Sequence, residues 1–384
     1  MVNAFPIAIV DRAGALSVFG AEVAQPANRL ADEGRWPAWA PGGAALAASS
    51  LENEDGQLRS RVHIYAPGGA SRSLIYESAP GVLPVIAPRL PHYLSWSPDG
   101  RRLGVVAQGP AGLQLTLHSF DGADPCVVAS GAPIFSSWSP DGSRLAVHAA
   151  AELTVVDGAP PHSRHILEQR ALGFRVPAWS PSGEDVLYAI AADAGVAVMS
   201  FSVDAGEARE VARFDGGVAL SFAPGGSPLY VCVTRNPEAG VFDDVWAVDP
   251  GTGTRQPVAR GPFVAMTWSP AGDRFALVLP AQTGDGRYYL QVYDRKGTVM
   301  ATAEAVVPSQ DMRTLFGFFD QYGLSHPLWA PDGSALLLSG RHVHDAVSNS
   351  FGDPVGNLVL RWAATRGTPL EVMAPGDLGF YAPP

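Results

Sequence analysis

One short phrase recurs seven times along the chain of 384 residues: an aromatic residue, a small residue, proline, any residue and glycine. The aromatic residues that mark the phrase are Trp39, Trp96, Trp138, Trp179, Phe222, Trp268 and Trp329. They stand 57, 42, 41, 43, 46 and 61 residues apart. Self-similarity at a period of about 40 residues is the signature of a repeat architecture, so this phrase constrains the fold more than any other feature.

The residues after each phrase predict the rest of the repeating unit. The second copy is followed by apolar stretches at residues 103–107, 113–120 and 126–129, with Gly-containing turns between them. Four short strands in about 42 residues are typical of one blade of a β-propeller. Proline ends the innermost strand because it lacks a donor, and Asp-Gly or Gly-Gly makes the tight turn that follows. The large indole is expected between neighbouring blades, and the small residue before it near the crowded central axis.

The sequence therefore predicts an all-β fold, a seven-bladed β-propeller of four-stranded antiparallel blades, in a single domain spanning residues 1–384. Strands within residues 7–20 are predicted to pack onto the last blade as a closing latch. Eight blades are the alternative, if these strands and the tail at residues 378–382 form a blade of their own. The seven blades are predicted at about residues 34–80, 90–130, 132–170, 174–213, 216–260, 262–304 and 325–375.

The two long spacings predict insertions at residues 305–325 and 341–357. In the first insertion, Ser309 is a candidate cap for a short helix, since serine accepts a hydrogen bond from a backbone amide of the first turn. The apolar residues that would share one face of this helix are Met312, Leu315, Phe316 and Phe319. Long loops in a compact repeat protein are often functional, so both insertions are of interest for function.

The phrase Trp-Ser-Pro-Asp-Gly, followed by an apolar strand, resembles the TolB-type, WD40-like (PD40) propeller repeat. The same repeat occurs in the propeller domains of prolyl-oligopeptidase-type peptidases. The resemblance covers residues from about 7 to 375 and implies the fold. It does not imply a function, because propellers serve as scaffolds, binding proteins, lyases and hydrolases. The chain has no Gly-x-Ser-x-Gly motif and no residues left for a hydrolase domain, so a peptidase of that type is excluded.

Composition excludes several further classes. The formal net charge is −11, whereas a nucleic-acid-binding protein needs a basic surface, so we expect no nucleic acid as partner. Lys296 is the single lysine and no phosphate-binding loop precedes it. No apolar run approaches the roughly 20 residues of a membrane span. Since the amino terminus also has no basic region before its apolar residues, we expect a cytoplasmic protein, and a monomer.

The best candidate metal ligands are His342, His344 and Asp345, with His326 or Asp320 as further candidates from the neighbouring insertion. Two histidines at i and i+2 lie on one face of a strand, so both imidazoles can reach one divalent metal ion. Propeller lyases that act on uronic-acid sugars use a His-rich metal site in the central channel. The alternative interpretation is that these are ordinary surface residues of a polar loop.

A second constellation emerges when the innermost strands are aligned on the marker aromatic. The residues three and four positions earlier should surround one mouth of the channel, and blades one to four and seven supply aromatic or basic groups there. These candidate ligand-binding residues are Arg35, Trp36, His92, Tyr93, Phe135, Arg175 and His326. Stacking rings and arginines suit a small anionic or sugar-like ligand, or the end of a peptide. The alternative is that the rings fill the channel as part of the core.

The sequence thus favours a propeller that is not an enzyme, needs no cofactor and serves as a protein-interaction or ligand-binding scaffold. The rival hypothesis is a metal-dependent uronate lyase or hydrolase acting in the channel through His342, His344 and Asp345. The partner is expected to be a protein or a small anionic or sugar-like molecule. Metal content and the arrangement of side chains at the channel mouth would discriminate between the two hypotheses.

Overall fold

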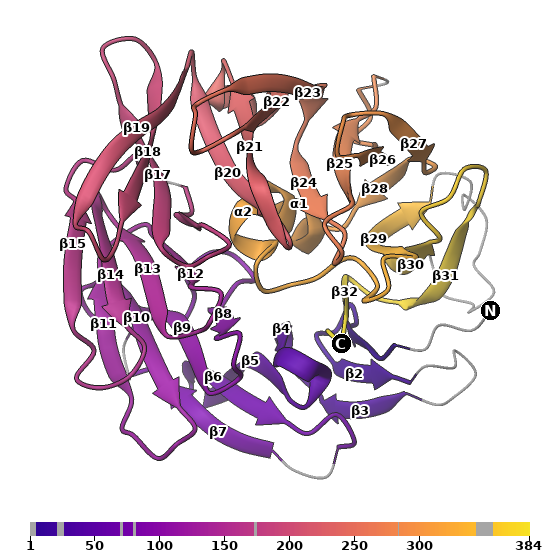
Figure 1. The fold of residues 1–384 in the computed structure, drawn as a ribbon. Helices are drawn as coiled ribbons and strands as arrows, with labels where there is room; N and C mark the ends of the chain where they lie inside the picture. The colour runs from indigo at the N-terminus through magenta and orange to yellow at the C-terminus, as the bar shows by residue number, and fades with distance from the viewer. Residues whose placement is uncertain are drawn as a thin grey trace. The chain divides into compact units, whose positions relative to one another are not determined.

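The computed structural model describes residues 5–20, 27–69, 72–79, 82–172, 175–282, 284–342 and 356–384. Almost all of its regular structure is β-strand, and every strand pair with a defined register is antiparallel (Figure 1). The chain divides into two compact units. The first unit contains residues 1–94, 265–294 and 298–384, and the second unit contains residues 95–264 and 295–297.

The second unit contains four four-stranded sheets whose strands follow one another in chain order, except that Tyr93 and Leu94 at the start of β8 belong to the first unit. Their strands are β8 (Tyr93–Trp96), β9 (Arg102–Gly109), β10 (Gly112–Ser119) and β11 (Cys126–Ser130); β12 (Ile134–Trp138), β13 (Arg144–Ala149), β14 (Glu152–Asp157) and β15 (Arg164–Glu168); β16 (Ala178–Trp179), β17 (Asp185–Ala191), β18 (Val196–Ser202) and β19 (Glu207–Phe214); and β20 (Gly217–Ala223), β21 (Gly226–Thr234), β22 (Phe242–Val248) and β23 (Arg255–Phe263). A short 3₁₀ turn, Pro237–Ala239, lies between β21 and β22.

The first unit contains two four-stranded sheets and one eight-stranded sheet. The first four-stranded sheet consists of β4 (Arg35–Trp39), β5 (Leu46–Glu54), β6 (Gln57–Tyr65) and β7 (Arg72–Glu77), with a 3₁₀ turn at Pro41–Gly43. The second consists of β1 (Ile7–Val10), β2 (Leu16–Phe19), β3 (Asn28–Ala31) and β32 (Leu378–Tyr381). The eight-stranded sheet contains β24 (Ala265–Trp268), β25 (Arg274–Pro280), β26 (Tyr288–Asp294), β27 (Val299–Thr302), β28 (Val306–Pro308), β29 (Leu336–His342), β30 (Leu358–Trp362) and β31 (Leu370–Pro375).

The repeated phrase makes a turn whose hydrogen bonds explain its sequence. In the second copy, the Ser97 hydroxyl donates to Asp99 Oδ1 and accepts from the Arg102 amide, while Asp99 Oδ1 accepts from the Arg101 amide. Gly100 then adopts a φ of 70°, which a residue without a side chain adopts at little cost. The third copy repeats these contacts through Ser139 and Asp141.

The marker indoles form hydrogen bonds to backbone carbonyls of the neighbouring sheet. This agrees with the predicted place of the indole between neighbouring blades. In the second unit, Trp138 Nε1 donates to the carbonyl of Ser95 and Trp179 Nε1 to that of Ser137, at 3.3 and 2.8 Å. Each acceptor immediately precedes the marker aromatic of the preceding sheet. Trp39 Nε1 makes the same kind of bond to the Phe380 carbonyl, at 3.2 Å. The position of Phe380 in β32 therefore corresponds to that of Ser95 in β8.

Both ends of the chain share one sheet. Strand β1 pairs with β32 from Ile7 opposite Tyr381 to Val10 opposite Leu378. The side chains of Ile7 and Ile9 pack with Leu337 and Val359 of the last sheet. Their hydrogen-bonded partner, however, is the tail. The separate sheet of the alternative prediction is present, and a blade count of seven is not confirmed.

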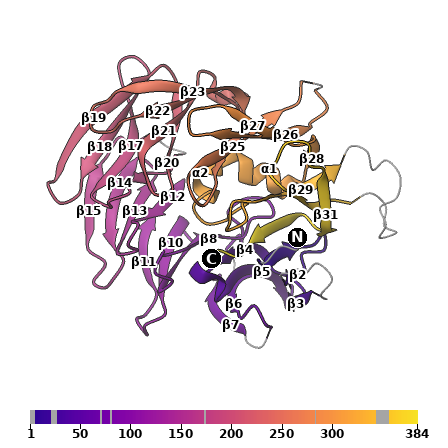
Figure 2. The same cartoon turned by 45° about the vertical axis from the view of Figure 1, so that its right-hand side comes forward.

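The first insertion lies within the innermost strand of the last blade, between residues 308 and 328, whereas the sequence predicted that it would come before that strand. Val306, Val307 and Pro308 of β28 pair with one end of β29, and the Leu337 amide of β29 donates to the Leu328 carbonyl, 2.9 Å away. Two short helices, α1 (Gln310–Gly317) and α2 (Phe319–Tyr322), lie between these two halves. Figure 2 shows α1 beside β28 and β29. The predicted insertion at 305–325 is therefore shorter at its start, because residues 306–308 belong to a strand.

The helical prediction for this insertion is confirmed in detail. Ser309 Oγ accepts a hydrogen bond from the Met312 amide at 3.0 Å, so Ser309 caps α1. The four apolar residues expected on one face are all buried: Met312, Leu315, Phe316 and Phe319. The second predicted insertion, residues 341–357, lies largely outside the described residues.

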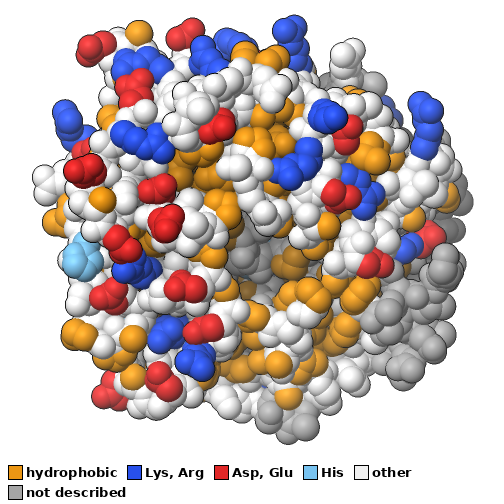
Figure 3. All heavy atoms as spheres, in the orientation of Figure 1, with side chains coloured by type: hydrophobic (Ala, Val, Ile, Leu, Met, Phe, Trp, Pro, Cys, Tyr) orange, Lys and Arg blue, Asp and Glu red, His pale blue; other side chains and the backbone are white. Residues whose placement is uncertain are grey.

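No helix in the described part of the chain is long and apolar enough to cross a membrane. On the face drawn in Figure 3, acidic and basic side chains are interspersed. Cys126 is partly exposed and Cys232 is buried, and neither belongs to a disulfide.

Candidate functional site

Three of the residues chosen from the sequence surround one ring in the first unit. Trp36 stacks on the ring of Tyr322, with ring centroids 4.9 Å apart and an interplanar angle of 30°. Tyr93 and His326 meet the same ring edge to face, with centroids at 5.5 and 5.1 Å. We refer to Trp36, Tyr93 and His326 as the aromatic cage. All three side chains and Tyr322 are buried.

The backbone around Trp36 aims its indole at the cage. The register of β4 against β5 shifts between Arg35 and Ala38, which is a β-bulge. Within the bulge, Trp36 has a φ of 49°, a left-handed conformation that costs a bulky residue of order 1–3 kcal/mol. Bulges re-aim side chains, and they are common next to functional sites. The indole Nε1 is fixed by a 3.1 Å hydrogen bond to the Arg89 carbonyl.

A short polar chain joins the cage to α2. The Tyr93 hydroxyl donates toward the Gln321 carbonyl and Ser325 Oγ, at 3.1 and 3.0 Å, and accepts from Gln321 Nε2 at 2.6 Å. Ser325 Oγ lies 2.7 Å from His326 Nδ1. The other ring nitrogen, His326 Nε2, is buried and makes no hydrogen bond of ordinary geometry. Gln321 and Ser325 therefore position two of the three cage residues, a role that the sequence alone did not reveal.

The cage carries no charge near neutral pH. Burial lowers the pKa of His326 to about 3, an effect that the nearby Trp36 backbone only partly opposes. Burial also raises the pKa of Tyr93 to about 12, although its bonds to Ser325 and Gln321 act in the other direction. Burial raises the pKa of Tyr322 as well. Because the imidazole and both phenols stay neutral, the cage suits an uncharged group.

The other predicted mouth residues have different surroundings. Arg35 Nε donates to Glu33 at 2.9 Å. His92 is fully buried between the hydroxyls of Ser60 and Ser49, at 3.1 and 2.9 Å, and burial lowers its pKa to about 3. The structure thus brings together Trp36, Tyr93 and His326, and gives Arg35 and His92 partners outside the cage.

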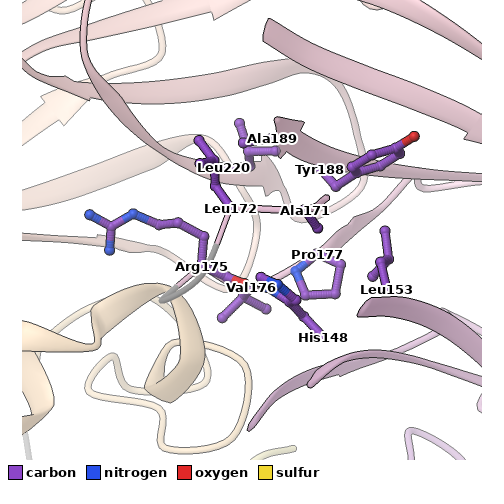
Figure 4. Close-up of a pocket in the computed structure, with 10 residues that line it drawn as sticks. All are labelled: His148, Leu153, Ala171, Leu172, Arg175, Val176, Pro177, Tyr188, Ala189 and Leu220. Carbon is purple, nitrogen blue, oxygen red and sulfur yellow. Dashed lines mark hydrogen bonds between the residues drawn. The ribbon is translucent and has the colours of Figure 1, made fainter. Parts of the chain in front are cut away.

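Phe135 and Arg175 belong to the second unit. Phe135 is buried. The guanidinium of Arg175 lies over the Phe242 ring, 5.4 Å from its centroid, and the Arg175 carbonyl accepts from His148 Nδ1 at 3.1 Å. A cavity beside Arg175 is lined by His148, Leu153, Ala171, Leu172, Arg175, Val176, Pro177, Tyr188, Ala189 and Leu220. Its volume of about 10 Å³ is enough for a single water, and in Figure 4 the Arg175 side chain points away from the other labelled residues.

Of the three main predicted metal ligands, His342, His344 and Asp345, the structure describes His342 only. Its Nε2 lies 2.7 Å from Glu304 Oε2, and the Glu304 side chain is about half exposed. His344 and Asp345 lie outside the described residues. Among the residues that are described, no three His, Cys, Asp or Glu side chains are grouped so that they could hold a metal ion. The imidazole of His342 and the carboxylate of Glu304 are themselves chemically suited to a divalent metal.

A buried ion-pair cluster, also in the first unit, ties α1 to the closing sheet. Arg89 Nη2 donates to Asp311 Oδ2 at 3.0 Å and to Asp377 Oδ2 at 2.7 Å. Asn357 Nδ2 donates to the second carboxylate oxygen of Asp377, and Ser309 Oγ donates to its backbone carbonyl. Asp311 is the first acidic residue of α1, and Asp377 immediately precedes β32. The cluster therefore fixes the base of the helical insertion.

Comparisons with known proteins agree with this architecture. No protein-family model matches the chain, and a search of curated proteins finds no similar sequence. Among solved structures, the dihydro-heme d1 dehydrogenase NirN is similar at a TM-score of 0.62 and 14% identity, over 98% of this chain and 75% of that chain. An oligogalacturonate lyase from Vibrio parahaemolyticus is similar at a TM-score of 0.53 and 12% identity, over 88% and 92%. TolB from Acinetobacter baumannii is similar at a TM-score of 0.42 and 14% identity, over 89% and 84%.

The four-stranded antiparallel sheets and these neighbours place the chain in the class of β-propeller-type proteins. The propeller-type fold that the resemblance to TolB-type repeats implied is supported by the strand topology and by the NirN and Vibrio structures. These three structures include a dehydrogenase and a lyase, and each is at most 14% identical to this chain. At that distance the likeness shows the fold and leaves the function to be argued from the site.

Proposed function

We propose that the chain is an eight-bladed β-propeller that acts as a non-catalytic binding scaffold. The eighth blade is the sheet made by β1, β2, β3 and β32, and the two strand groups of the eight-stranded sheet count as separate blades. The hydrogen bond from Trp39 to Phe380 supports this count, because it repeats the bond from Trp138 to Ser95. A shortened copy of the phrase, Tyr381-Ala382-Pro383, stands at the matching position.

The observation that carries the scaffold proposal is that the polar side chains near the innermost strands of the first unit are buried and hydrogen-bonded to other groups of the protein. His92 lies between two serine hydroxyls, His326 bonds to Ser325, and Tyr93 bonds to Gln321. General acid–base catalysis needs a group whose pKa lies near the working pH and that reaches substrate. Both histidines are buried with pKa values of about 3, so their chemistry favours a structural or binding role over proton transfer.

A protein partner or a small ligand is the expected occupant of the scaffold. For a small anionic or sugar-like ligand, the proposed contacts are the predicted mouth residues of each unit taken separately, with Arg35 as the charged group in the first unit and Arg175 in the second. Replacing these two arginines with alanine should leave folding intact and weaken any anionic ligand found by thermal-shift screening. If both variants bind the anionic ligand with unchanged affinity, Arg35 and Arg175 do not contact it. A cytoplasmic location, a monomeric state and the absence of nucleic-acid binding stay predictions from the sequence.

The alternative proposal is a metal-dependent uronate lyase. The contact between His342 and Glu304 favours it, because an imidazole and a carboxylate at 2.7 Å are two of the ligands that such a site needs. In this case His342, His344 and Asp345 would hold a divalent metal, whose role would be to stabilise the charge that develops on the sugar carboxylate.

One experiment separates the two proposals. The purified protein is analysed for manganese, zinc and iron, and is then assayed with oligogalacturonate and added metal for the ultraviolet absorbance of the unsaturated product. The scaffold proposal predicts less than stoichiometric metal and no product above the level of a His342→Ala control. Stoichiometric metal together with product that depends on His342 would establish the lyase and reject the scaffold.

A further inference from the structure

We propose that the aromatic cage is a binding site for a planar, uncharged ring, and that the chain's own Tyr322 occupies it, so that a ligand competes with α2. This inference rests on the proposed function as a binding scaffold and assigns the chemistry of one site. The cage is Trp36, Tyr93 and His326, as defined above.

The arrangement of rings resembles that around a bound ligand. Tyr322 has one ring stacked on it and two others against it edge to face, with all three centroids within 4.9–5.5 Å of its own. Stacked and edge-to-face contacts are the two geometries that aromatic pairs prefer. The three cage residues come from different parts of the chain, namely β4, the start of β8 and the segment after α2. The fourth ring, Tyr322, is delivered by the insertion.

The conformation of Trp36 points to a role other than packing. A bulge and a left-handed φ of 49° are needed to direct its indole at Tyr322, and the following residue is Pro37, which disfavours helical conformations before it. An ordinary strand residue would fill a core without this strain. Strained backbone is concentrated at binding and catalytic sites, where the surrounding structure holds it in place.

The helical insertion takes no part in the strand pairing of its sheet. The chain departs from β29 opposite Gly340 and rejoins it beside Leu337, so α1 and α2 form a closed excursion from a strand that keeps its pairing with β30. Compact loops of this kind, with their ends close together, are often functional. Three of its buried residues are polar: Asp311, Asp320 and Gln321. Two of them bond to groups outside the insertion, Asp311 to Arg89 and Gln321 to Tyr93, so a ligand has to compete with these contacts as well as with the ring of Tyr322.

The polar groups of the cage define the ligand. The Tyr93 hydroxyl and His326 Nε2 are the groups that a ligand can bond, and neither is charged near neutral pH. No arginine is a member of the cage, and Arg35 is paired with Glu33. The expected ligand is therefore an uncharged aromatic or heteroaromatic ring that carries one hydroxyl or amide group, as the phenol of Tyr322 does.

The first test replaces the internal occupant. Tyr322→Ala should bind p-cresol, with a rise in melting temperature of about 3 °C at ~100-fold its Kd. It should bind toluene at least tenfold more weakly, because toluene cannot bond the Tyr93 hydroxyl or His326. The matched control is Phe275→Ala, which removes another fully buried ring of the first unit; there toluene should bind at least as well as p-cresol. If Tyr322→Ala does not fold, Tyr322→Leu is tested in the same way.

The second test uses the wild-type chain. Saturating p-cresol should accelerate amide hydrogen exchange in residues 310–322 and leave exchange in β25 unchanged. Equal binding of toluene and p-cresol by the Tyr322 variant, or unaltered exchange in α1 and α2, would overturn the proposal. These results are independent of the metal and lyase assay: lyase activity rejects the scaffold, whereas loss of ring selectivity rejects only the cage.

Discussion

Replacing Arg89 with methionine should test whether the ion-pair cluster holds the helical insertion in place. Arg89 joins Asp311 on α1 to Asp377 before β32, and the two carboxylate side chains are only 7% and 5% exposed. Methionine preserves the aliphatic part of the side chain and removes the guanidinium. The variant therefore leaves two acidic groups buried without their cation.

The expected loss of stability in Arg89→Met depends on how deeply Arg89, Asp311 and Asp377 are buried. Removing one partner of a fully buried ion pair costs about 3–5 kcal/mol. The Arg89 side chain is 37% exposed, so water screens part of the interaction, and we expect a loss of about 2–3 kcal/mol in the free energy of unfolding at pH 7. The loss should be measured by urea denaturation, with tryptophan fluorescence as the signal.

The loss should also depend on pH. Burial already raises the pKa of Asp311, and Arg89 opposes that rise. Without Arg89, the pKa of Asp311 in the folded state moves further above its unfolded value. The folded state then binds the proton more tightly than the unfolded state, so stability falls as pH rises through this window and recovers as pH is lowered. The difference between Arg89→Met and wild type should therefore be smaller at pH 5 than at pH 7.

Two controls make this prediction refutable. Arg213 pairs with Glu210 on the surface, and Arg213→Met should leave the denaturation midpoint unchanged. Adding Asp311→Asn to Arg89→Met should restore part of the lost stability, because a neutral amide is less costly to bury than an unpaired carboxylate. If Arg89→Met behaves like Arg213→Met, or loses the same stability at pH 5 and pH 7, the cluster does not have the role assigned to it.

Three further predictions concern the closing sheet, the buried histidines and the helix cap. Deleting residues 378–384 removes the strand that pairs with β1, so the variant should melt at a lower temperature and aggregate through the exposed edge in size-exclusion chromatography; a monodisperse variant with wild-type melting would contradict this. Burial lowers the pKa values of His92 and His326 to about 3, so the stability that each contributes should be fully present above pH 6.5 and decrease below it, by roughly 1.4 kcal/mol per histidine and pH unit. Burial also lowers the pKa values of His63, His118 and His148, so His92→Asn should remove only the share of one histidine from the slope between pH 6.5 and 5, and a flat profile in the wild type would refute the prediction. Ser309→Ala should cost about 1 kcal/mol in chemical denaturation through loss of the helix cap, whereas Thr314→Ala on the exposed side of α1 should cost less, and equal costs would argue against the capping role.

The local structure of the repeat was predictable because the residues that determine each turn lie within the phrase itself. Proline and glycine determine the turn, and the indole finds its acceptor one repeat earlier in the chain. The cap at Ser309 and the buried face of α1 were predictable for the same reason, since helix capping and amphipathic spacing act within a few residues. The shortened phrase at Tyr381 was also present in the sequence, and it would have predicted the separate closing sheet.

The candidate site was predictable only in part. Aligning the innermost strands selected Trp36, Tyr93 and His326 correctly as neighbours, because equivalent positions in repeats meet around a common centre. The ring that fills the cage, Tyr322, comes from an insertion that breaks the repeat and so has no equivalent in the other blades. The bond from Arg89 to Asp377 spans 288 residues, and no periodicity connects two such positions.

The pairing of β1 with β32 has a consequence for synthesis of the chain. A ribosome releases the first hairpin long before the residues that complete its sheet, so β1 presents an unpaired apolar edge throughout elongation. Because β32 is synthesised after β1, β1 cannot form this pairing until β32 has left the ribosome. Factors that shield nascent chains should accordingly matter most for the segment that contains β1 and β2.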